Sequence, residues 1–339
     1  MSEPQQPLSS SKPNTVQRLR ELAKSNPQRI VFPETEDPRV IAAAEKLVKL
    51  GLAKPILIGG DEIPGADRID PADPKLVQQC SQQLFENRKH KGLTLEAAEQ
   101  ALDDKLIFAS LLVRLGHADG TVAGSIATTA SVIRAGLYGV GLPQSSDDQK
   151  TGKLVSSFFL MQLPDRCLTY SDAGVVPDPD EQQLAEIAVT AARNHELLTG
   201  ETAKVAMLSF STKGSAHHDR VTKVRSATEL AKAINPDLLI DGELQFDAAF
   251  VPEVAARKAA DSPVAGQANV FIFPDLDSGN IAYKITERLA GATALGPLVQ
   301  GLAKPCMDLS RGCSADDIVD VAVVASALAQ AQTNAQGQA

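Results

Sequence analysis

The residues with the most chemical potential lie together near the C-terminus. Residues 308–317, DLSRGCSADD, combine a hydroxyl, a guanidinium, a thiol and carboxylates just before a stretch with helical periodicity. Free backbone N–H groups at a helix start can receive a phosphate group, and Arg311 can bind such a group through two parallel hydrogen bonds. A structural interpretation is equally open, because Ser314 with Asp317 three residues later fits a helix N-cap.

Three other patterns suggest chemistry but favour ordinary structural roles. Cys313 is a candidate nucleophile if Arg311 favours its thiolate, yet no histidine lies near it, so a buried inert cysteine is favoured. The adjacent His217 and His218 lack the spacing of metal ligands, so we expect no metal. Residues 211–215, STKGS, lack the GxxxxGK[ST] spacing of a P-loop and predict a turn between strand and helix.

The elements that must position these residues follow from the hydrophobic pattern. Short apolar runs predict strands, and longer stretches with a 3.6-residue period predict helices. Strands separated by helices of about 10–20 residues imply βαβ units and largely parallel sheets. The strands are predicted at 30–32, 55–58, 158–163, 204–208, 238–240 and 270–273, and the helices at 38–50, 106–115, from 129, at 180–200 and from 314.

Ligands of open α/β sheets bind beyond the carboxyl ends of the strands. Five loops at such positions are rich in Ser, Thr, Gly, Asp and Arg: residues 33–39, 123–129, 211–215, 274–280 and 308–317.

Three arginines near these loops are candidate anion anchors. Arg39 and Arg134 each lie near the start of a helical segment, where a salt bridge to a neighbouring carboxylate is the alternative role. Arg88 belongs to the basic cluster at 88–91, for which a solvated surface is the default interpretation.

The composition narrows the class of protein. A length of 339 residues favours two domains, and the polar stretch at 141–153 is the best candidate for a crossing between them. A net charge of −9 argues against nucleic-acid or membrane-surface partners. The four scattered cysteines argue against disulfides, and the polar start and the lack of a long apolar run favour a cytoplasmic protein with a disordered tail over residues 1–15.

Several segments together resemble the phosphate acetyltransferase (phosphotransacetylase) family. These segments are PETEDPR, RKHKGLT, ADGTVAGS with TTASVIR, AMLSFSTKGSA, IDGELQFDAA, SPVAGQANVFIFPDLDSGNIAYKI and GLAKPCMDLSRGCSADDIV, and the resemblance covers residues 15–330. It implies reversible transfer of an acetyl group between acetyl phosphate and coenzyme A, in a homodimer without metal or redox cofactor. It also implies two three-layer α/β domains with an active-site cleft between them, one discontinuous over 16–145 plus 306–339, the other over 146–305.

The same resemblance implies roles for individual residues. Asp317 would act as the base toward the coenzyme A thiol, Ser310 would hydrogen-bond the acyl group, and Arg311 would hold the phosphoryl group. The ordinary pKa of a thiol lies about 4.6 units above that of an aspartate, so full proton transfer is uphill by roughly 6 kcal/mol and the base needs help from its surroundings. The expected substrate-binding residues are Arg39, Arg88, Arg134, Thr129, Ser278, Gly279 and Asn280.

Three competing functions stay open at this stage. A phosphate butyryltransferase would perform the same chemistry in a wider acyl pocket, and the segments at 127–129 and 171–180 leave the acyl preference undecided. A decarboxylating dehydrogenase has a related architecture, but no GxGxxG follows a strand here. A non-catalytic module that binds coenzyme A or phosphate is disfavoured because Ser310, Arg311 and Asp317 are all present.

Overall fold

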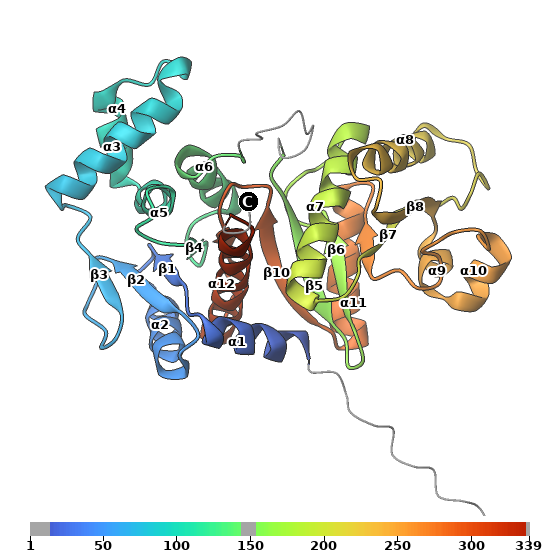
Figure 1. Cartoon of the computed structure of the whole chain (residues 1–339), viewed down its shortest axis with the longest axis horizontal. Coiled ribbons are helices and arrows are strands. Elements are labelled where there is room, and N and C mark those ends of the chain that lie inside the picture. Colours follow the sequence, from blue (N-terminus) through green and yellow to red (C-terminus); the bar gives the residue numbers. More distant parts are fainter. Residues whose placement is uncertain (1–13, 144–153, 337–339) are drawn as a thin grey trace, which may run out of the picture.

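The computed structural model describes residues 14–143 and 154–336, which form two β-sheets flanked by helices (Figure 1). In the first sheet the strand order is β11-β4-β1-β2-β3, and every neighbouring pair is parallel. Its strands are β1 (Arg29–Phe32), β2 (Lys54–Ile58), β3 (Asp67–Ile69), β4 (Gly120–Ala123) and β11 (Cys306–Asp308). Since β11 comes from far along the chain, the chain returns to its first sheet before the last helix.

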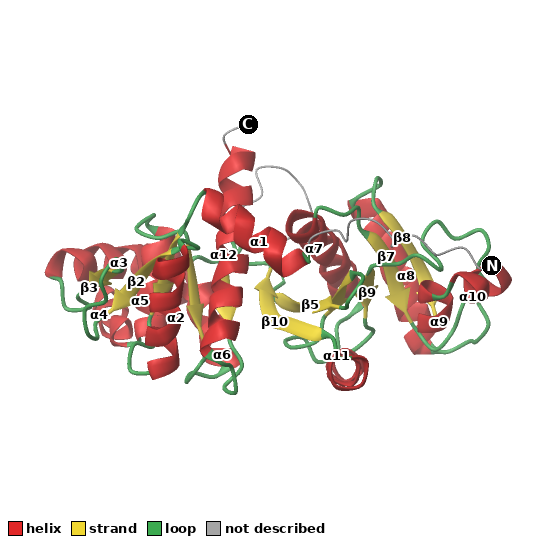
Figure 2. Ribbon diagram, turned by 90° about the horizontal axis from the view of Figure 1, so that it is seen from below, coloured by secondary structure: helices red, strands yellow, loops and turns green. Residues whose placement is uncertain are grey.

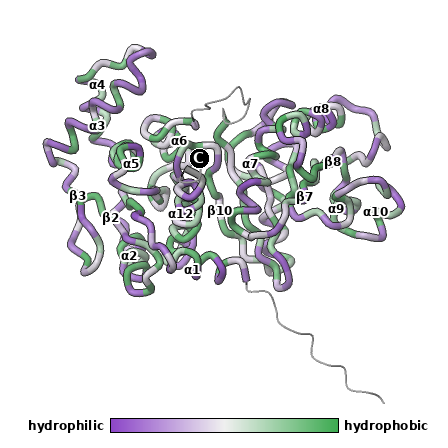
Figure 3. The backbone as a smooth tube through the Cα atoms, viewed as in Figure 1, coloured by the Kyte–Doolittle hydropathy of each residue, from purple (hydrophilic) through white to green (hydrophobic). Residues whose placement is uncertain are grey.

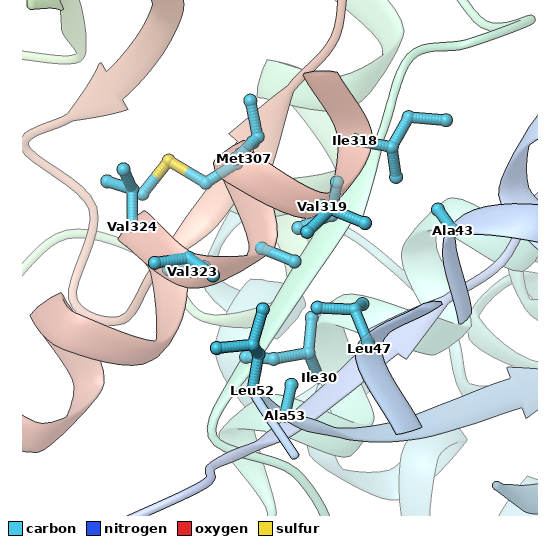
Figure 4. Close-up of a cluster of buried hydrophobic side chains, with 14 of the residues drawn as sticks. Ile30, Ala43, Leu47, Leu52, Ala53, Met307, Ile318, Val319, Val323 and Val324 are labelled. Atoms are coloured by element: carbon cyan, nitrogen blue, oxygen red, sulfur yellow. The ribbon is translucent and has the colours of Figure 1, made fainter. Parts of the chain in front are cut away.

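Helices cover both faces of this sheet because β1 is apolar on both sides. Ile30 lies in a buried cluster with side chains of α2 and α12 (Figure 4), which Phe32 also joins. Val31 packs in a second cluster with α3, α5 and α6. The helices associated with the first sheet are α1 (Thr15–Ser25), α2 (Pro38–Leu50), α3 (Pro74–Arg88), α4 (Leu95–Gln100), α5 (Lys105–Arg114), α6 (Thr129–Gly139) and α12 (Ala315–Gln336), with short 3₁₀ turns η1 (Lys89–Lys91) and η2 (Ala101–Asp103).

The second sheet is mixed, with strand order β10-β5-β6-β9-β7-β8. Figure 2 shows β10 and β5 toward one side of this sheet and β7 and β8 toward the other. Its β6, β9, β7 and β8 are parallel, while β10 with β5 and β5 with β6 are antiparallel. Its strands are β5 (Ser156–Gln162), β6 (Cys167–Ser171), β7 (Lys204–Leu208), β8 (Leu239–Leu244), β9 (Val270–Ile272) and β10 (Thr293–Gln300), and its helices are α7 (Glu181–Thr199), α8 (Asp219–Ile234), α9 (Phe246–Phe250), α10 (Pro252–Lys258) and α11 (Leu276–Ala290).

The helix α12 lies where the two sheets meet, in the hydrophobic middle of the molecule (Figure 3). Its apolar side chains share one buried cluster with Phe158 and Leu160 of β5 and with Leu298 of β10, as well as with α2. A helix that is apolar almost all round must be covered on all sides, and this one is covered by elements of both sheets. The start of α12, which carries Asp317, is therefore held between the two sheets.

The predicted α/β class with largely parallel sheets is confirmed, whereas the strands β3, β6, β10 and β11 were not predicted. The strand predicted at 238–240 is longer, as β8, and Ser314 precedes the final helix rather than starting it. The prediction missed α1, whose first turn is capped by the Asn14 side chain, so the predicted tail ends too late. Residues 1–13 of that tail and residues 144–153 of the predicted crossing lie outside the described residues. The exact domain boundaries stay a prediction.

Candidate active site

The loop between β11 and α12 presents two of the predicted catalytic side chains outward. Leu309 and Cys313 are buried, whereas Ser310 and Arg311 between them are exposed. The backbone N–H of Cys313 donates to the carbonyl of Ser310 at 2.9 Å, which closes a tight turn. Two buried anchors and this turn hold the exposed pair at the carboxyl edge of the first sheet.

The guanidinium of Arg311 is bound to the start of α6. Its Nη1 donates to the carbonyl of Ala127 at 2.9 Å, and its Nη2 donates to the Thr129 hydroxyl at 3.3 Å. Both partners precede or begin α6, so the arginine connects two loops that follow neighbouring strands, β4 and β11. The remaining guanidinium N–H groups can bind an anion in the space beside it.

Asp317 forms the helix cap that its spacing from Ser314 predicts. Its Oδ2 accepts hydrogen bonds from the Ser314 backbone N–H at 2.8 Å and hydroxyl at 2.9 Å, and its own N–H donates to that hydroxyl at 3.2 Å. The side chain is exposed, and within the described part of the chain Oδ1 has no hydrogen-bond partner. The capping role therefore leaves one carboxylate oxygen available to a ligand.

A cavity of about 510 Å³ brings Ser310, Arg311 and Asp317 together. Its floor is formed by the loop at 308–313, and its opposite wall comes from the second sheet and α11. The apolar side includes Phe159, whose ring stacks on Tyr283 at 3.9 Å between centroids. Further lining residues, not predicted from the sequence, are Asp308, Lys284, Glu287 and Arg288 among the polar ones and Ala173, Leu295, Pro297 and Val321 among the apolar ones.

A second, larger cavity of about 810 Å³ adjoins the first, because Thr129 and Gly174 line both. Arg88, Arg134 and Lys91 line this second cavity, and their positive charges suit an anionic ligand; His90 lines it as well. Arg88 lies over the Tyr138 ring at 3.8 Å from its centroid. Arg134 approaches a carboxylate only loosely, with 3.6 Å to Asp104. The structure thus places Arg88 and Arg134 beside the loop at 308–317 rather than within it.

Arg39 lies elsewhere, and its donors are used by the protein. Its guanidinium forms a salt bridge with Asp37 at 2.7 Å and also donates to the carbonyls of Ser125, Arg311 and Cys313. The hydrogen bonds that the Arg39 side chain donates to Asp37 lower the pKa of the Asp37 carboxyl below its ordinary value. Arg39 does not line either of the two cavities. In this structure it connects three loops around the site, which is the ion-pair alternative considered for it.

Of the three candidate substrate-binding residues at the start of α11, two have structural roles and one lines the cavity. The Ser278 hydroxyl donates to the Asp275 carbonyl at 2.8 Å within the first turn of the helix. Gly279 lies against the Asp172 carbonyl so closely that a Cβ would overlap it. Asn280 donates to the Ala173 carbonyl at 3.1 Å and lines the cavity that holds Ser310, Arg311 and Asp317. Only Asn280 of the three is placed to meet a ligand there.

Two buried carboxylates that build the site were not among the predicted residues. Glu34 accepts hydrogen bonds from the four consecutive backbone N–H groups of residues 124–127, at 2.7–3.1 Å. Asp172 does the same for the loop after β6, accepting from the N–H groups of Gly174, Val175 and Val176. The only signal in the sequence was an acidic residue in a loop that follows a strand. This signal does not show which backbone N–H groups the carboxylate binds.

Asp308 is the third unpredicted carboxylate, although it stands in the predicted loop. It is fully buried, and its Oδ2 accepts the Thr129 hydroxyl at 2.6 Å. Among the described residues its other oxygen, Oδ1, has no hydrogen-bond partner. Burial raises the pKa of the Asp308 carboxyl to about 6, with Glu34 acting in the same direction, while the hydrogen bond from Thr129 and the charge of Arg311 lower it.

The remaining chemical patterns have structural roles. Burial raises the pKa of the Cys313 thiol, against the opposing charge of Arg39, and this supports the inert interpretation. His218 caps α8, with its Nδ1 accepting from the Arg220 backbone N–H at 3.1 Å. Across residues 14–143 and 154–336, no group of three or more His, Cys, Asp or Glu is placed to hold a metal ion. No helix described there is long and apolar enough to cross a membrane.

Comparison with known proteins gives a consistent result over nearly the whole chain. The family model described as Phosphate acetyl/butaryl transferase matches residues 14–326. A phosphate acetyltransferase of Acetivibrio thermocellus is 46% identical over 331 residues, covering 93% of this chain and 98% of the relative. One of Paracoccus denitrificans is 46% identical over 315 residues, covering 91% and 97%.

The fold comparison agrees with the sequence comparison. The crystal structure of a phosphotransacetylase from Streptococcus pyogenes superposes with a TM-score of 0.85 at 43% identity, covering 94% of this chain and 98% of that one. Given a family match over most of its length, close relatives of the same size and a shared fold, this chain belongs to the phosphate acetyl/butaryl transferase family of acyltransferases.

Proposed function

We propose that this chain transfers an acetyl group reversibly between acetyl phosphate and coenzyme A, by direct attack of the thiol in a ternary complex. The observation that carries the proposal is the single cavity lined by Ser310, Arg311 and Asp317, next to a larger cavity with Arg88 and Arg134. A long anionic ligand such as coenzyme A fits the larger cavity, with its thiol reaching past Thr129 into the smaller one. Relatives named phosphate acetyltransferase support the acetyl group as the one transferred.

The proposed reaction needs no reactant other than acetyl phosphate and coenzyme A. Asp317 Oδ1 takes the proton of the thiol as the sulfur forms a bond to the acetyl carbonyl carbon. The Ser310 hydroxyl donates a hydrogen bond to the oxyanion of the tetrahedral intermediate, and Arg311 binds the phosphoryl oxygens. The intermediate then collapses, and the bond between the acetyl carbon and the phosphate oxygen breaks. Inorganic phosphate leaves with the electron pair and takes up the proton that Asp317 accepted, which regenerates the carboxylate. Positioning and charge stabilisation supply the rate acceleration.

Thioester formation is the direct test. Purified protein mixed with acetyl phosphate and coenzyme A should form acetyl-CoA and phosphate in equal amounts, and acetyl-CoA with phosphate should run the reaction backwards. Butyryl phosphate in a parallel reaction tests the family's other acyl group, and faster turnover of butyryl phosphate would contradict acetyl transfer as the main activity. No thioester from either donor would refute the proposal.

Three further properties belong to the same proposal. Coenzyme A is a substrate, and the reaction as written uses no metal or redox cofactor, so activity should survive exhaustive treatment with a chelator. Homodimer assembly stays a prediction, which light scattering tests by returning twice the mass of one chain. A cytoplasmic location is also a prediction, tested by fractionation of cells that express the chain.

A further inference from the structure

Asp308 is a buried carboxylate whose presence costs stability. It has no exposed surface, it lacks a partner for Oδ1 among the described residues, and burial favours its neutral form. The chain also keeps room for it, because Gly124, at a φ of +106°, faces this carboxylate, and a Cβ there would overlap Oδ1 and lie 2.7 Å from the Leu309 nitrogen. A carboxylate retained at such a position calls for an explanation other than packing.

The hydrogen bonds around Asp308 lead to the guanidinium in the cavity. A hydroxyl has one proton, and Thr129 donates its proton to Asp308 Oδ2 at 2.6 Å. The hydroxyl lone pairs are then free to accept the Arg311 Nη2 at 3.3 Å. The other contact of this guanidinium within the described residues is to the Ala127 carbonyl. With Asp308 ionised, the hydroxyl therefore turns its negative side toward the arginine.

We propose that Asp308 is a positioning residue for the acyl transfer, which acts by orienting the Thr129 hydroxyl as an acceptor for the Arg311 guanidinium. The proposal rests on the proposed function, in which Arg311 binds the phosphoryl group. Without the carboxylate, the hydroxyl is free to turn its proton toward the guanidinium, and one of the two contacts that direct Arg311 is lost. The substrate itself does not touch Asp308 in this scheme.

The charge of Asp308 makes the proposal dependent on pH. The titratable and charged groups that face it are Arg311 on its own loop and Glu34 from the loop after β1, while Thr129 of α6 provides the hydrogen bond. Glu34 is itself bound by four backbone N–H groups and by the Ser125 hydroxyl. Because the pKa of Asp308 lies near 6, the carboxylate orients Thr129 at neutral pH and loses this effect in more acidic solution.

The first experiment compares kinetics and folding of the intact wild-type chain and Asp308→Asn. At about pH 8 we expect kcat/KM for acetyl phosphate to fall about ten- to a hundredfold in the variant, with the KM for coenzyme A unchanged. The wild type should lose kcat/KM for acetyl phosphate below about pH 6, and the variant should lack this acid limb. Asp316→Asn, an exposed carboxylate two residues into α12 that pairs with Lys46, is the matched control and should behave as wild type.

The second experiment tests the route through Thr129. Thr129→Val should lose activity to the same extent as Asp308→Asn, and Thr129→Ser should keep most of the wild-type activity. The double variant Asp308→Asn with Thr129→Val should be no less active than the less active of its two single variants. Losses that multiply in the double variant, or wild-type kinetics of Asp308→Asn at about pH 8, would overturn the proposal. If Asp308→Asn does not fold, the comparison of Thr129→Val with Thr129→Ser tests the proposal instead. Equal activity of these two variants refutes it. A wild type that forms no acetyl-CoA refutes the proposed function instead.

Discussion

The replacement Asp317→Asn separates the two roles that one carboxylate has in this structure. In this structure the Ser314 N–H and hydroxyl donate to Asp317 Oδ2 at 2.8 and 2.9 Å. An asparagine oxygen can still accept these two hydrogen bonds, but it cannot take a thiol proton. The loss of one exposed charge at a helix start costs about 0.3–1 kcal/mol of unfolding free energy. The loss of a general base reduces kcat by about a hundred- to ten-thousandfold. Activity should therefore fall far more than stability.

Ser314→Ala is the matched variant, because it removes the cap and leaves the base. It deletes the 3.2 Å bond from the Asp317 N–H and one of the two bonds that orient the carboxylate. We expect a loss of about 1 kcal/mol of unfolding free energy, and a decrease in kcat of at most about tenfold. Asp317 keeps the 2.8 Å bond from the Ser314 backbone in this variant.

The assay measures kcat and kcat/KM for coenzyme A in both variants from about pH 6 to about pH 9, with denaturant unfolding of the same samples. Full kcat of Asp317→Asn across this range would remove Asp317 from the mechanism. Equal losses of kcat in the two variants would assign the effect to the helix cap rather than to proton transfer. Only a large loss of kcat in Asp317→Asn, without a matching loss in Ser314→Ala, supports the base.

Three further replacements test the other parts of the site. Cys313→Ala should keep most of its kcat, because burial raises the pKa of the thiol, and exchange of labelled phosphate into acetyl phosphate without coenzyme A would contradict this. Arg88→Gln should raise the KM for coenzyme A about tenfold and leave the KM for acetyl phosphate unchanged, as steady-state kinetics would show. Phe159→Leu widens the apolar wall of the catalytic cavity, so the ratio of butyryl to acetyl turnover should rise about tenfold, and an unchanged ratio would place the acyl group elsewhere.

The elements that sequence reasoning found are those with strong local signals. The strands β1, β2, β7 and β9 are short apolar runs closed by turn residues, and α7, predicted as the helix at 180–200, starts with a capping box formed by Asp180 and Gln183. The missed β10 is interrupted by Gly296 and Pro297, which break the strand pattern. The missed α1 is a polar helix that is stable because Leu19 and Ala23 pack into the cluster of α12, a contact across most of the chain.

In the candidate site, too, the sequence revealed the features with a local signal and missed those that depend on distant contacts. The loop at 308–317 stood out by its residue types alone, and its resemblance to a family supplied the roles of Ser310, Arg311 and Asp317. Spacing in the sequence could not show which other residues lie near this loop, since Arg39 and Arg134 each stand near the start of a helical segment. In the folded chain, Arg39 binds loop carbonyls whereas Arg134 lines a cavity.

The sequence alone predicted the α/β class, and it offered the candidate loops and the Ser314 helix cap as one of two interpretations, because each depends on residues within a few positions of one another. Only the tertiary structure decided which side chains share a cavity and which are consumed in holding loops together. Asp308, Thr129 and Arg311 illustrate the reason: two of them are neighbours on one loop, but the hydroxyl between them comes from a helix about 180 residues earlier. Hydrogen bonds of this kind are set by the pairing of β4 with β11, which no local pattern encodes.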